Sequence, residues 1–242
     1  VTRLQSLEYM LSMQAGKLGL TEINVINNVP GAFGIFRKSF LQQIGGWNTG
    51  TAEDLDLTLR IKQYQGRHPE LRFEFEPGAV SHTDVPDKLI DFLKQRLRWD
   101  GDLLYIYANK HRLGISASIM GWNNFIFIMW YGILFQIVMP FTIVLYMIYM
   151  IVVLPMPFFL ASMTLVYLFY FCLTLIQFLL YLAVISDRPR KDSSAFLIIP
   201  IYPLFQFAVR LWSALAISNQ ILNKGHLDSA MAPFWVLKKG KQ

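Results

Sequence analysis

The chain has 242 residues, of which 54% are hydrophobic and 16% are charged, and its formal net charge is +6. A soluble domain is nearer ~45–50% apolar and ~25% charged, so this composition excludes a purely soluble protein. Charged residues concentrate in residues 1–112, whereas about residues 117–217 are almost continuously apolar. Most Lys and Arg lie near the apolar stretches, which favours contact with anionic lipid headgroups over binding of nucleic acid. The composition therefore predicts a water-exposed part followed by a membrane part.

The first 112 residues alternate between helical and extended patterns. Helical periodicity, with acidic starts or glycine ends, predicts helices at residues 4–18, 37–44, 53–65 and 87–109. β-branched residues, glycine-flanked stretches or strict alternation predict extended segments at residues 23–29, 32–36, 71–76 and 79–82. This alternation predicts an α/β fold. The strands are too few to close a sheet, so residues 1–112 are expected to form only part of such a domain.

Three apolar stretches follow, at about residues 123–154, 158–185 and 195–217. Each exceeds the ~20 residues that an α-helix needs to span a bilayer. The basic loop at residues 187–192 predicts a cytoplasmic position for that loop. If residues 1–112 are also cytoplasmic, the first two stretches form a transmembrane hairpin.

The third stretch leaves two alternatives. It contains Pro200, Pro203, Gln206 and Arg210, and a basic tail at residues 238–241 follows it. A full span would place this tail outside, whereas a re-entrant or interfacial helix around residues 204–222 would keep it inside, as the positive-inside rule favours. The predicted organisation has three parts: a cytosolic domain at residues 1–112, a membrane domain at 113–222 with two to three transmembrane helices plus interfacial helices, and a basic cytosolic tail at 223–242.

Two polar clusters stand out in the first part. Glu53 and Asp54 begin the predicted helix at residues 53–65, while Gln95, Arg98 and Trp99 have the i, i+3, i+4 spacing that places them on one helical face. Acidic residues in a first turn often only cap a helix. A carboxylate at such a position can also act as a general base. Trp99 could likewise be an interfacial anchor, although Trp122 and Trp130 suit that role better.

Five features in this order carry a family resemblance: Gly31-Ala-Phe-Gly34, Gly45-Gly46-Trp47, Glu53-Asp54, Gln95-x-x-Arg98-Trp99 and membrane helices after them. The order resembles the processive family 2 glycosyltransferases, which include cellulose, chitin, hyaluronan and poly-N-acetylglucosamine synthases. The resemblance covers roughly residues 1–155. It implies a partial GT-A-type domain followed by α-helical transmembrane segments, and an inverting, membrane-embedded transferase. One departure concerns the glycine after Trp99, which the family commonly has three residues later and this chain has two residues later; this leaves the subfamily open.

The resemblance also implies roles for individual residues. Asp54 is the expected general base, with Glu53 beside it. Gln95 and Arg98 are expected to contact the donor diphosphate, and Trp99 is expected to stack on the acceptor sugar at the mouth of the polymer channel. A further expected set forms the floor of the acceptor site: Gly31, Phe33 and Gly34.

In the family a divalent metal, Mg²⁺ or Mn²⁺, is held by an Asp-x-Asp motif that follows a strand and precedes the catalytic pair. Neither Asp54-Leu55-Asp56 nor Asp100-Gly101-Asp102 has that position. The metal motif is therefore expected upstream of Val1, and no metal ligand is expected within the chain. This interpretation also predicts that residues 1–242 are the C-terminal part of a longer enzyme and are inactive alone.

The leading hypothesis is transfer of a sugar from a nucleotide-diphosphate sugar, expected to be a UDP-sugar, to a growing β-linked polysaccharide. One alternative is a non-processive family 2 transferase with a lipid acceptor, and another is a non-catalytic membrane transport or scaffold protein. Expected partners are the sugar donor, a polysaccharide or oligosaccharide acceptor and membrane lipids, with an accessory subunit left open and no nucleic acid. The expected location is a bacterial inner or plasma membrane, with several spans and the catalytic part facing the cytoplasm.

Overall fold

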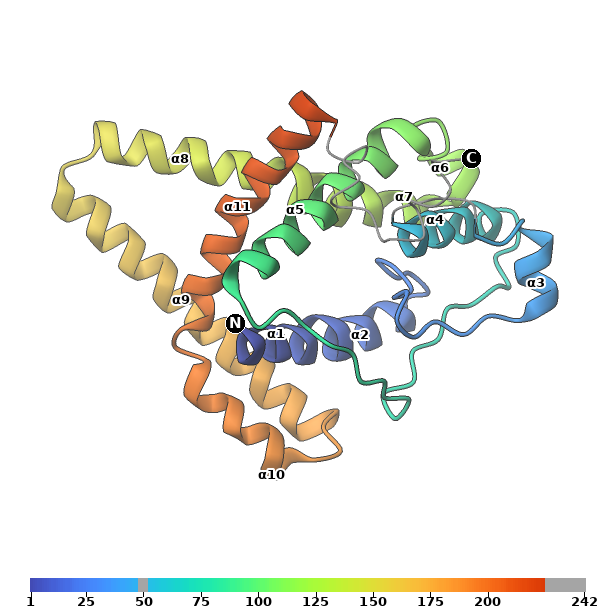
Figure 1. Ribbon diagram of the computed structural model, residues 1–242, viewed down its shortest axis with the longest axis horizontal. Helices are drawn as coiled ribbons and strands as arrows, with labels where there is room; N and C mark the ends of the chain where they lie inside the picture. The colour runs from blue at the N-terminus through green and yellow to red at the C-terminus, as the bar shows by residue number, and fades with distance from the viewer. Residues whose placement is uncertain (48–51, 225–242) are drawn as a thin grey trace.

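The structure is a computed structural model that describes residues 1–47 and 52–224. Three helical segments, α1 (Thr2–Glu8), η1 (Tyr9–Ala15) and α2 (Gly16–Glu22), follow one another without a break and form an N-terminal rod. The short helix α3 (Lys38–Gln43) and the longer α4 (Glu53–Gln65) come next, and then α5 (Leu89–Tyr105) continues into η2 (Ile106–Lys110). Figure 1 shows α4 and α5 above this rod.

The four predicted helices of the first 112 residues are confirmed. Gly45 and Gly46, which end α3, have φ values of +84° and +62°, a conformation that glycine adopts without steric cost. Three acidic residues occupy the first turn of α4, where they interact favourably with the positive end of the helix dipole.

The predicted α/β fold is not confirmed, because residues 1–47 and 52–224 contain no assigned β-strand. No strand is assigned in the segments at 23–29, 32–36, 71–76 and 79–82, which were expected to be strands or extended pieces, so strands there are not confirmed. Residues 71–76 are irregular and have no neighbouring strand, although Phe73 is buried between the exposed Arg72 and Glu74, as the alternation predicted. The Asn24 side chain takes the place of a strand partner: its Nδ2 donates to the Leu71 carbonyl at 3.0 Å, and its Oδ1 accepts from Phe73 N at 3.1 Å.

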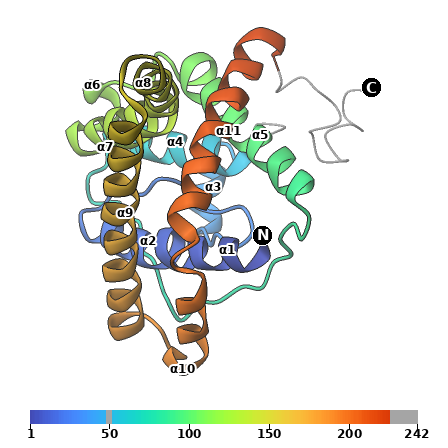
Figure 2. The ribbon, with the colours of Figure 1, turned by 90° about the vertical axis from the view of Figure 1, so that its left-hand side faces the viewer.

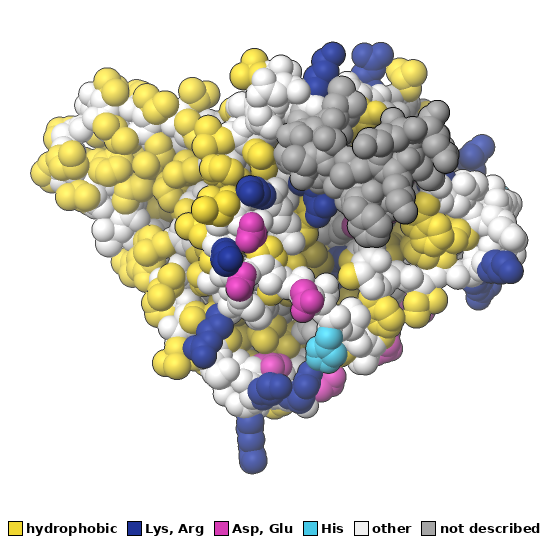
Figure 3. All heavy atoms as spheres, in the orientation of Figure 1, with side chains coloured by type: hydrophobic (Ala, Val, Ile, Leu, Met, Phe, Trp, Pro, Cys, Tyr) yellow, Lys and Arg dark blue, Asp and Glu magenta, His cyan; other side chains and the backbone are white. Residues whose placement is uncertain are grey.

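The second half of the chain is built from long apolar helices. After the short α6 (Ala117–Met120), three segments form one helix of 32 residues, Trp122–Val153: α7 (Trp122–Phe127), η3 (Ile128–Val138) and α8 (Met139–Val153). A second helix, α9 (Met156–Val184), has 29 residues. Both are long and apolar enough to cross a membrane, and hydrophobic side chains gather over the α8–α9 corner (Figure 3).

The third apolar stretch is broken. Two short segments, α10 (Pro189–Asp192) and η4 (Ser193–Ile198), precede α11 (Tyr202–Asn223), and the axis bends by 70° between Pro189–Ile198 and Tyr202–Asn223. This bend fits a broken span or a re-entrant segment, the two alternatives that the sequence left open. Figure 2 shows α11 running across α5, the helix with which it makes its most extensive contacts. The basic tail at residues 238–241 lies outside the described residues.

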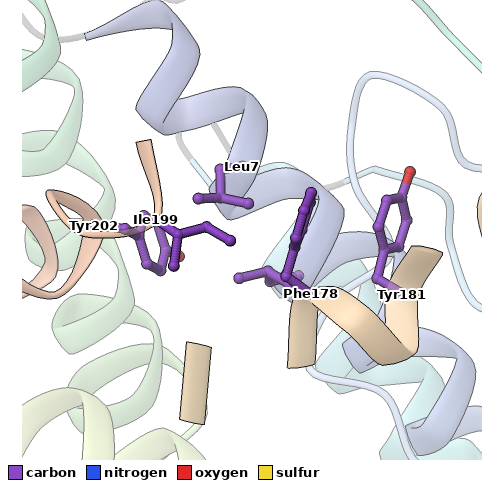
Figure 4. Packing of buried hydrophobic residues seen from close by; sticks show 6 residues of the cluster. Leu7, Phe178, Tyr181, Ile199 and Tyr202 are labelled. Atoms are coloured by element: carbon purple, nitrogen blue, oxygen red, sulfur yellow. The ribbon is translucent and has the colours of Figure 1, made fainter. Parts of the chain in front are cut away.

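Two buried clusters join the N-terminal half to the apolar helices. In the first, Leu7 of the N-terminal rod points toward Phe178 and Ile199, with Tyr181 and Tyr202 at its edges (Figure 4). In the second, Leu55 and Leu59 of α4 pack with residues of η2, α6 and η3. The helix that begins with Glu53 and Asp54 is therefore supported directly by the first apolar helix. The boundary between a cytosolic domain and a membrane domain at residue 112 remains a prediction.

Candidate functional site

Asp54 lies in the first turn of α4 and is half-buried. Asn28 Nδ2 donates to its Oδ2 at 3.0 Å, and the backbone N–H of Leu55 donates to its Oδ1 at 2.8 Å. The second contact shows that the carboxylate does help to hold the helix start, as acidic residues in a first turn often do. The first contact has no capping role. It fixes the orientation of the carboxylate from outside the helix.

A buried lysine supports Asn28 from the N-terminal rod. Lys17 is 1% exposed, and its Nζ donates to the Asn28 carbonyl at 2.9 Å. Burial lowers the pKa of Lys17 to about 8, and the nearby Asp54 carboxylate opposes this shift. Lys17, Asn28 and Asp54 thus form a connected set that aligns the carboxylate.

The Gly31–Gly34 turn lies beside the acidic pair. A Cβ atom added to Gly31 would stand 3.5 Å from Glu53 Oε1 and 3.7 Å from Asp54 Cβ. At Gly34 there is no room for a side chain, since an added Cβ would approach Val29 Cγ1 to 2.7 Å. Phe33 is 43% exposed. The structure therefore places Gly31, one of the three residues predicted to form the acceptor floor, beside Glu53 and Asp54.

Asp56, two residues after Asp54, has a different environment. Its side chain is fully buried and accepts from Arg60 Nε at 3.1 Å, from Lys110 Nζ at 2.8 Å and from His111 Nε2 at 2.8 Å. Gln63 holds the other ring nitrogen of His111 at 3.0 Å, so a neutral imidazole that accepts from Gln63 donates to Asp56. Burial raises the pKa of Asp56, but the hydrogen bonds from His111 and Lys110 outweigh it and lower the pKa to about 2.

This arrangement, which we call the Asp56 clamp (Asp56, Arg60, Lys110 and His111), connects three segments. Arg60 also donates to the backbone carbonyls of Ile44, at 2.9 Å, and Gly46, at 2.5 Å. Lys110 and His111 come from the end of the long α5–η2 segment. The clamp therefore holds α4 against both the Gly45–Gly46 turn and the end of the helix that carries the second polar cluster.

The second cluster lies at the middle of α5. Gln95 Oε1 accepts from Gln5 Nε2 at 3.1 Å. Arg96 forms an ion pair with Glu8, and its guanidinium lies 4.8 Å from the centre of the Trp99 ring. Arg98 makes no hydrogen bond or ion pair within residues 1–47 and 52–224. Its guanidinium is therefore available for a ligand.

The two clusters contact different parts of the N-terminal rod. Gln5 and Glu8 contact α5, whereas Lys17 reaches Asn28 beside Asp54. Twelve helical residues separate Gln5 from Lys17, or roughly 18 Å along the axis. The structure therefore brings residues together within each predicted cluster. No contact joins Asp54 to Trp99 among the described residues, and the rod connects the two clusters.

Several of these residues were not predicted from the sequence, namely Gln5, Glu8, Lys17, Asn28, Arg96 and the Asp56 clamp. Arg96 stands within the Gln95–Trp99 motif, and that position was a signal that could have been used. The polar residues of the N-terminal rod have no such signal, because a polar face is ordinary in an amphipathic helix.

The described residues do not fit a metal site. They contain no group of three or more His, Cys, Asp or Glu side chains that could hold a metal ion. Asp56, the second acid of Asp54-Leu55-Asp56, is engaged with Arg60, Lys110 and His111. Its carboxylate is not available as a ligand.

Comparison with known protein families identifies the relationship. Residues 24–217 match the family model described as glycosyl transferase family group 2. The chain belongs to this family. The match includes both polar clusters and extends through the apolar helices, and it confirms at the family level the resemblance that the sequence motifs indicated.

Comparison with individual curated proteins finds more specific similarities. The chain is 28% identical over 98 residues to a poly-β-1,6-N-acetyl-D-glucosamine synthase of Staphylococcus epidermidis. It is 30% identical over 100 residues to the corresponding synthase of Staphylococcus aureus strain COL. Each alignment covers 40% of this chain and 23% of the relative, so the chain matches about a quarter of the length of these relatives. Comparison with solved structures finds no match.

Proposed function

We propose that the chain forms part of a membrane-embedded, inverting glycosyltransferase that extends a β-linked polysaccharide from a nucleotide-diphosphate sugar. The observation that carries the proposal is the family match over residues 24–217, within which Asp54 is held by Asn28 next to Gly31. The named activity of the staphylococcal relatives favours UDP-N-acetylglucosamine as the donor.

In the proposed reaction an acceptor hydroxyl attacks the anomeric carbon of the donor sugar. Asp54 takes the hydroxyl proton as the new C–O bond forms, and the bond to the diphosphate breaks on the opposite face, which inverts the configuration. The hydrogen bond from Asn28 orients the carboxylate for this step. The acceptor sugar is proposed to lie beside Glu53 and Asp54, next to Gly31, which has no side chain.

The second cluster is proposed to hold the substrates. Arg98, which has no partner among the described residues, is suited to phosphate oxygens of the donor. Arg96 lies over one face of Trp99, and the other face is proposed to stack on a pyranose ring. Gln95 contributes a second polar contact. Mg²⁺ or Mn²⁺ belongs to the proposal only for the full-length protein, since the described residues here do not fit a metal site.

The proposed location is a membrane, with the catalytic part on the cytoplasmic side. Arg188, Arg190 and Lys191 are exposed in the connection after α9, and basic connections of this kind stay in the cytoplasm. Leu7 of the N-terminal rod packs beside Phe178 and Tyr181, close to the same end of α9. This packing supports placing the N-terminal half on the side of the basic connection.

The test is an Asp54→Asn substitution in the full-length protein. Membranes that contain the variant should transfer radiolabelled N-acetylglucosamine from UDP-N-acetylglucosamine roughly 10²–10⁴-fold more slowly, the usual contribution of a general base. Asp84→Asn is the matched control, because Asp84 is exposed in the connection before α5. Transfer by Asp54→Asn at the rate of this control would contradict the proposed role of Asp54.

A further inference from the structure

Arg96 is the residue through which the N-terminal rod holds the second polar cluster. Its side chain is 11% exposed and forms an ion pair with Glu8, whose side chain is 15% exposed. One turn earlier in the rod, the fully buried Gln5 donates to Gln95 Oε1 at 3.1 Å. Successive turns of the rod therefore contact two adjacent residues of α5. Because both charged side chains are largely withdrawn from water, their attraction is screened less than that of an exposed pair.

The paired guanidinium also contacts two aromatic rings of α5. Its central carbon lies 5.0 Å from the centre of the Phe92 ring and 4.8 Å from the centre of the Trp99 ring. The spacing of four and three residues places the three side chains on one face of the helix. A planar guanidinium stacks on an aromatic face and is attracted by its π electrons. Arg96 therefore restrains one face of the Trp99 ring.

A second carboxylate competes for the same guanidinium. Asp100 stands four residues after Arg96 on α5, a spacing at which two helical side chains are neighbours. Burial raises the pKa of Asp100, and the positive charge of Arg96 is among the influences that oppose this shift. Asp100 Oδ2 and Arg96 Nε are both buried, and neither has a hydrogen-bond partner among the described residues. Without the Glu8 carboxylate, we expect the guanidinium to turn toward Asp100 and to leave its position over Trp99.

We propose that Glu8 is a positioning residue for the acceptor: it holds Arg96 over one face of Trp99, so that the other face is oriented to stack on the acceptor sugar. This role rests on the proposed function, in which Trp99 binds the acceptor. Glu8 contacts no substrate and acts only through Arg96. The rod reaches the Asp54 cluster separately, through Lys17. Loss of the Glu8 charge should therefore weaken acceptor binding and leave donor binding unchanged.

The test compares Glu8→Gln with Glu22→Gln in the purified full-length protein in lipid vesicles. Glu22 is exposed on α2 of the same rod, so its substitution removes an equal charge at a site outside the Arg96 pair. Calorimetry measures the dissociation constant of a β-1,6-linked N-acetylglucosamine oligosaccharide. Transfer of radiolabelled sugar measures the Michaelis constant for UDP-N-acetylglucosamine.

The dissociation constant of the oligosaccharide should rise about three- to tenfold in Glu8→Gln, the size expected for loss of a largely buried cation–π contact. It should stay at the wild-type level in Glu22→Gln, and the Michaelis constant for the donor should stay at the wild-type level in both variants. Wild-type binding of the oligosaccharide by Glu8→Gln, or an equal rise in Glu22→Gln, would overturn the role of Glu8. A parallel rise of the donor Michaelis constant in Glu8→Gln would also overturn it, because a general loss of structure affects both substrates.

A second substitution tests the route through Arg96. In an Arg96→Gln background Glu8 has no guanidinium to hold, so adding Glu8→Gln should weaken oligosaccharide binding no further. Additive effects of the two substitutions would overturn this route. Wild-type protein that transfers no sugar would contradict the proposed function, and the role of Glu8 would fall with it. Wild-type protein that transfers sugar, beside a Glu8→Gln variant that binds the oligosaccharide normally, would contradict the role of Glu8 alone.

Discussion

Asp54 and Asp56 are two acids of one helical turn that have opposite environments. Asp54 has one side-chain hydrogen-bond donor, Asn28, and remains half-buried beside the Gly31–Gly34 turn. Asp56 is fully buried and accepts from Arg60, Lys110 and His111. A carboxylate that is already surrounded by donors has little capacity to take a proton from a substrate. The packing around the turn therefore separates a candidate base from a structural acid.

The Asp56 clamp predicts a specific acid dependence of stability. The pKa of Asp56 is about 2 in the folded protein, below its ordinary value of 3.8. Ionised Asp56 therefore contributes stability that is complete above about pH 4 and is lost as the pH falls toward 2. In thermal unfolding between pH 2 and 6 in detergent, the melting temperature of the wild type should fall more steeply with decreasing pH than that of Asp56→Asn.

Asp56→Asn should also be less stable than the wild type at pH 7, because it leaves Arg60, Lys110 and His111 without the buried carboxylate that accepts their hydrogen bonds. Asp84→Asn, at an exposed position, should follow the wild-type profile. Parallel acid profiles for Asp56→Asn and the wild type would show that the clamp does not contribute as an ion pair.

At the level of elements, Gly66, which follows the end of α4, packs closely against α6. A Cβ atom added to Gly66 would stand 2.1 Å from the Ile119 carbonyl oxygen and 2.7 Å from Met120 Cα. Both obstacles are backbone atoms, so neither can move aside as a side chain would. A second close approach joins η2 and η3, where a Cβ atom on Gly132 would stand 2.6 Å from the Tyr107 ring.

Gly66→Ala should therefore destabilise the protein by about 3 kcal/mol, at the upper end of what overpacking costs. Gly19→Ala is the control, because an added Cβ at Gly19 meets nothing within 4 Å and alanine favours the helix. The control should stabilise the protein by roughly 0.5–1 kcal/mol. Thermal unfolding of the two variants measures the difference. A melting temperature for Gly66→Ala at or above that of Gly19→Ala would show that α4 and α6 do not pack in this way.

Helices were predictable from the sequence because their signals are local. The acids at residues 53–56 and Gly66 mark the two ends of α4 within a few residues, and the apolar helices need only length and composition. The expected strands are not confirmed, and the reason is the opposite one: a strand needs a partner that is distant in sequence. Residues 71–76 have the correct alternation of exposure, but their partner is the side chain of Asn24, 47 residues before Leu71.

The candidate site was predictable to the same extent. The motifs identified Asp54, Gly31 and Trp99, whose types and order are informative by themselves. The residues that support these motifs could not be predicted from the sequence. Lys17 and Gln5 belong to a helix whose pattern indicates only amphipathicity, and their roles depend on how that helix lies against Asn28 and Gln95.

At the level of the whole molecule, the N-terminal rod connects every part that the proposed function needs. It contacts the Gln95–Trp99 cluster through Gln5 and Glu8, and the Asp54 cluster through Lys17. Leu7 anchors the same rod against α9 and the segment before α11. The positions of both clusters are thus set relative to the apolar helices, which is the arrangement that synthesis coupled to a membrane would require.

The central claim is that the full-length protein polymerises a sugar. The direct measurement is the size of the product formed when the purified full-length protein, in lipid vesicles, receives radiolabelled UDP-N-acetylglucosamine. We predict a β-linked polymer of many residues, well resolved from single-sugar products by gel filtration. Transfer of one sugar to a lipid, or no transfer from any member of a panel of UDP-sugars, would contradict the claim.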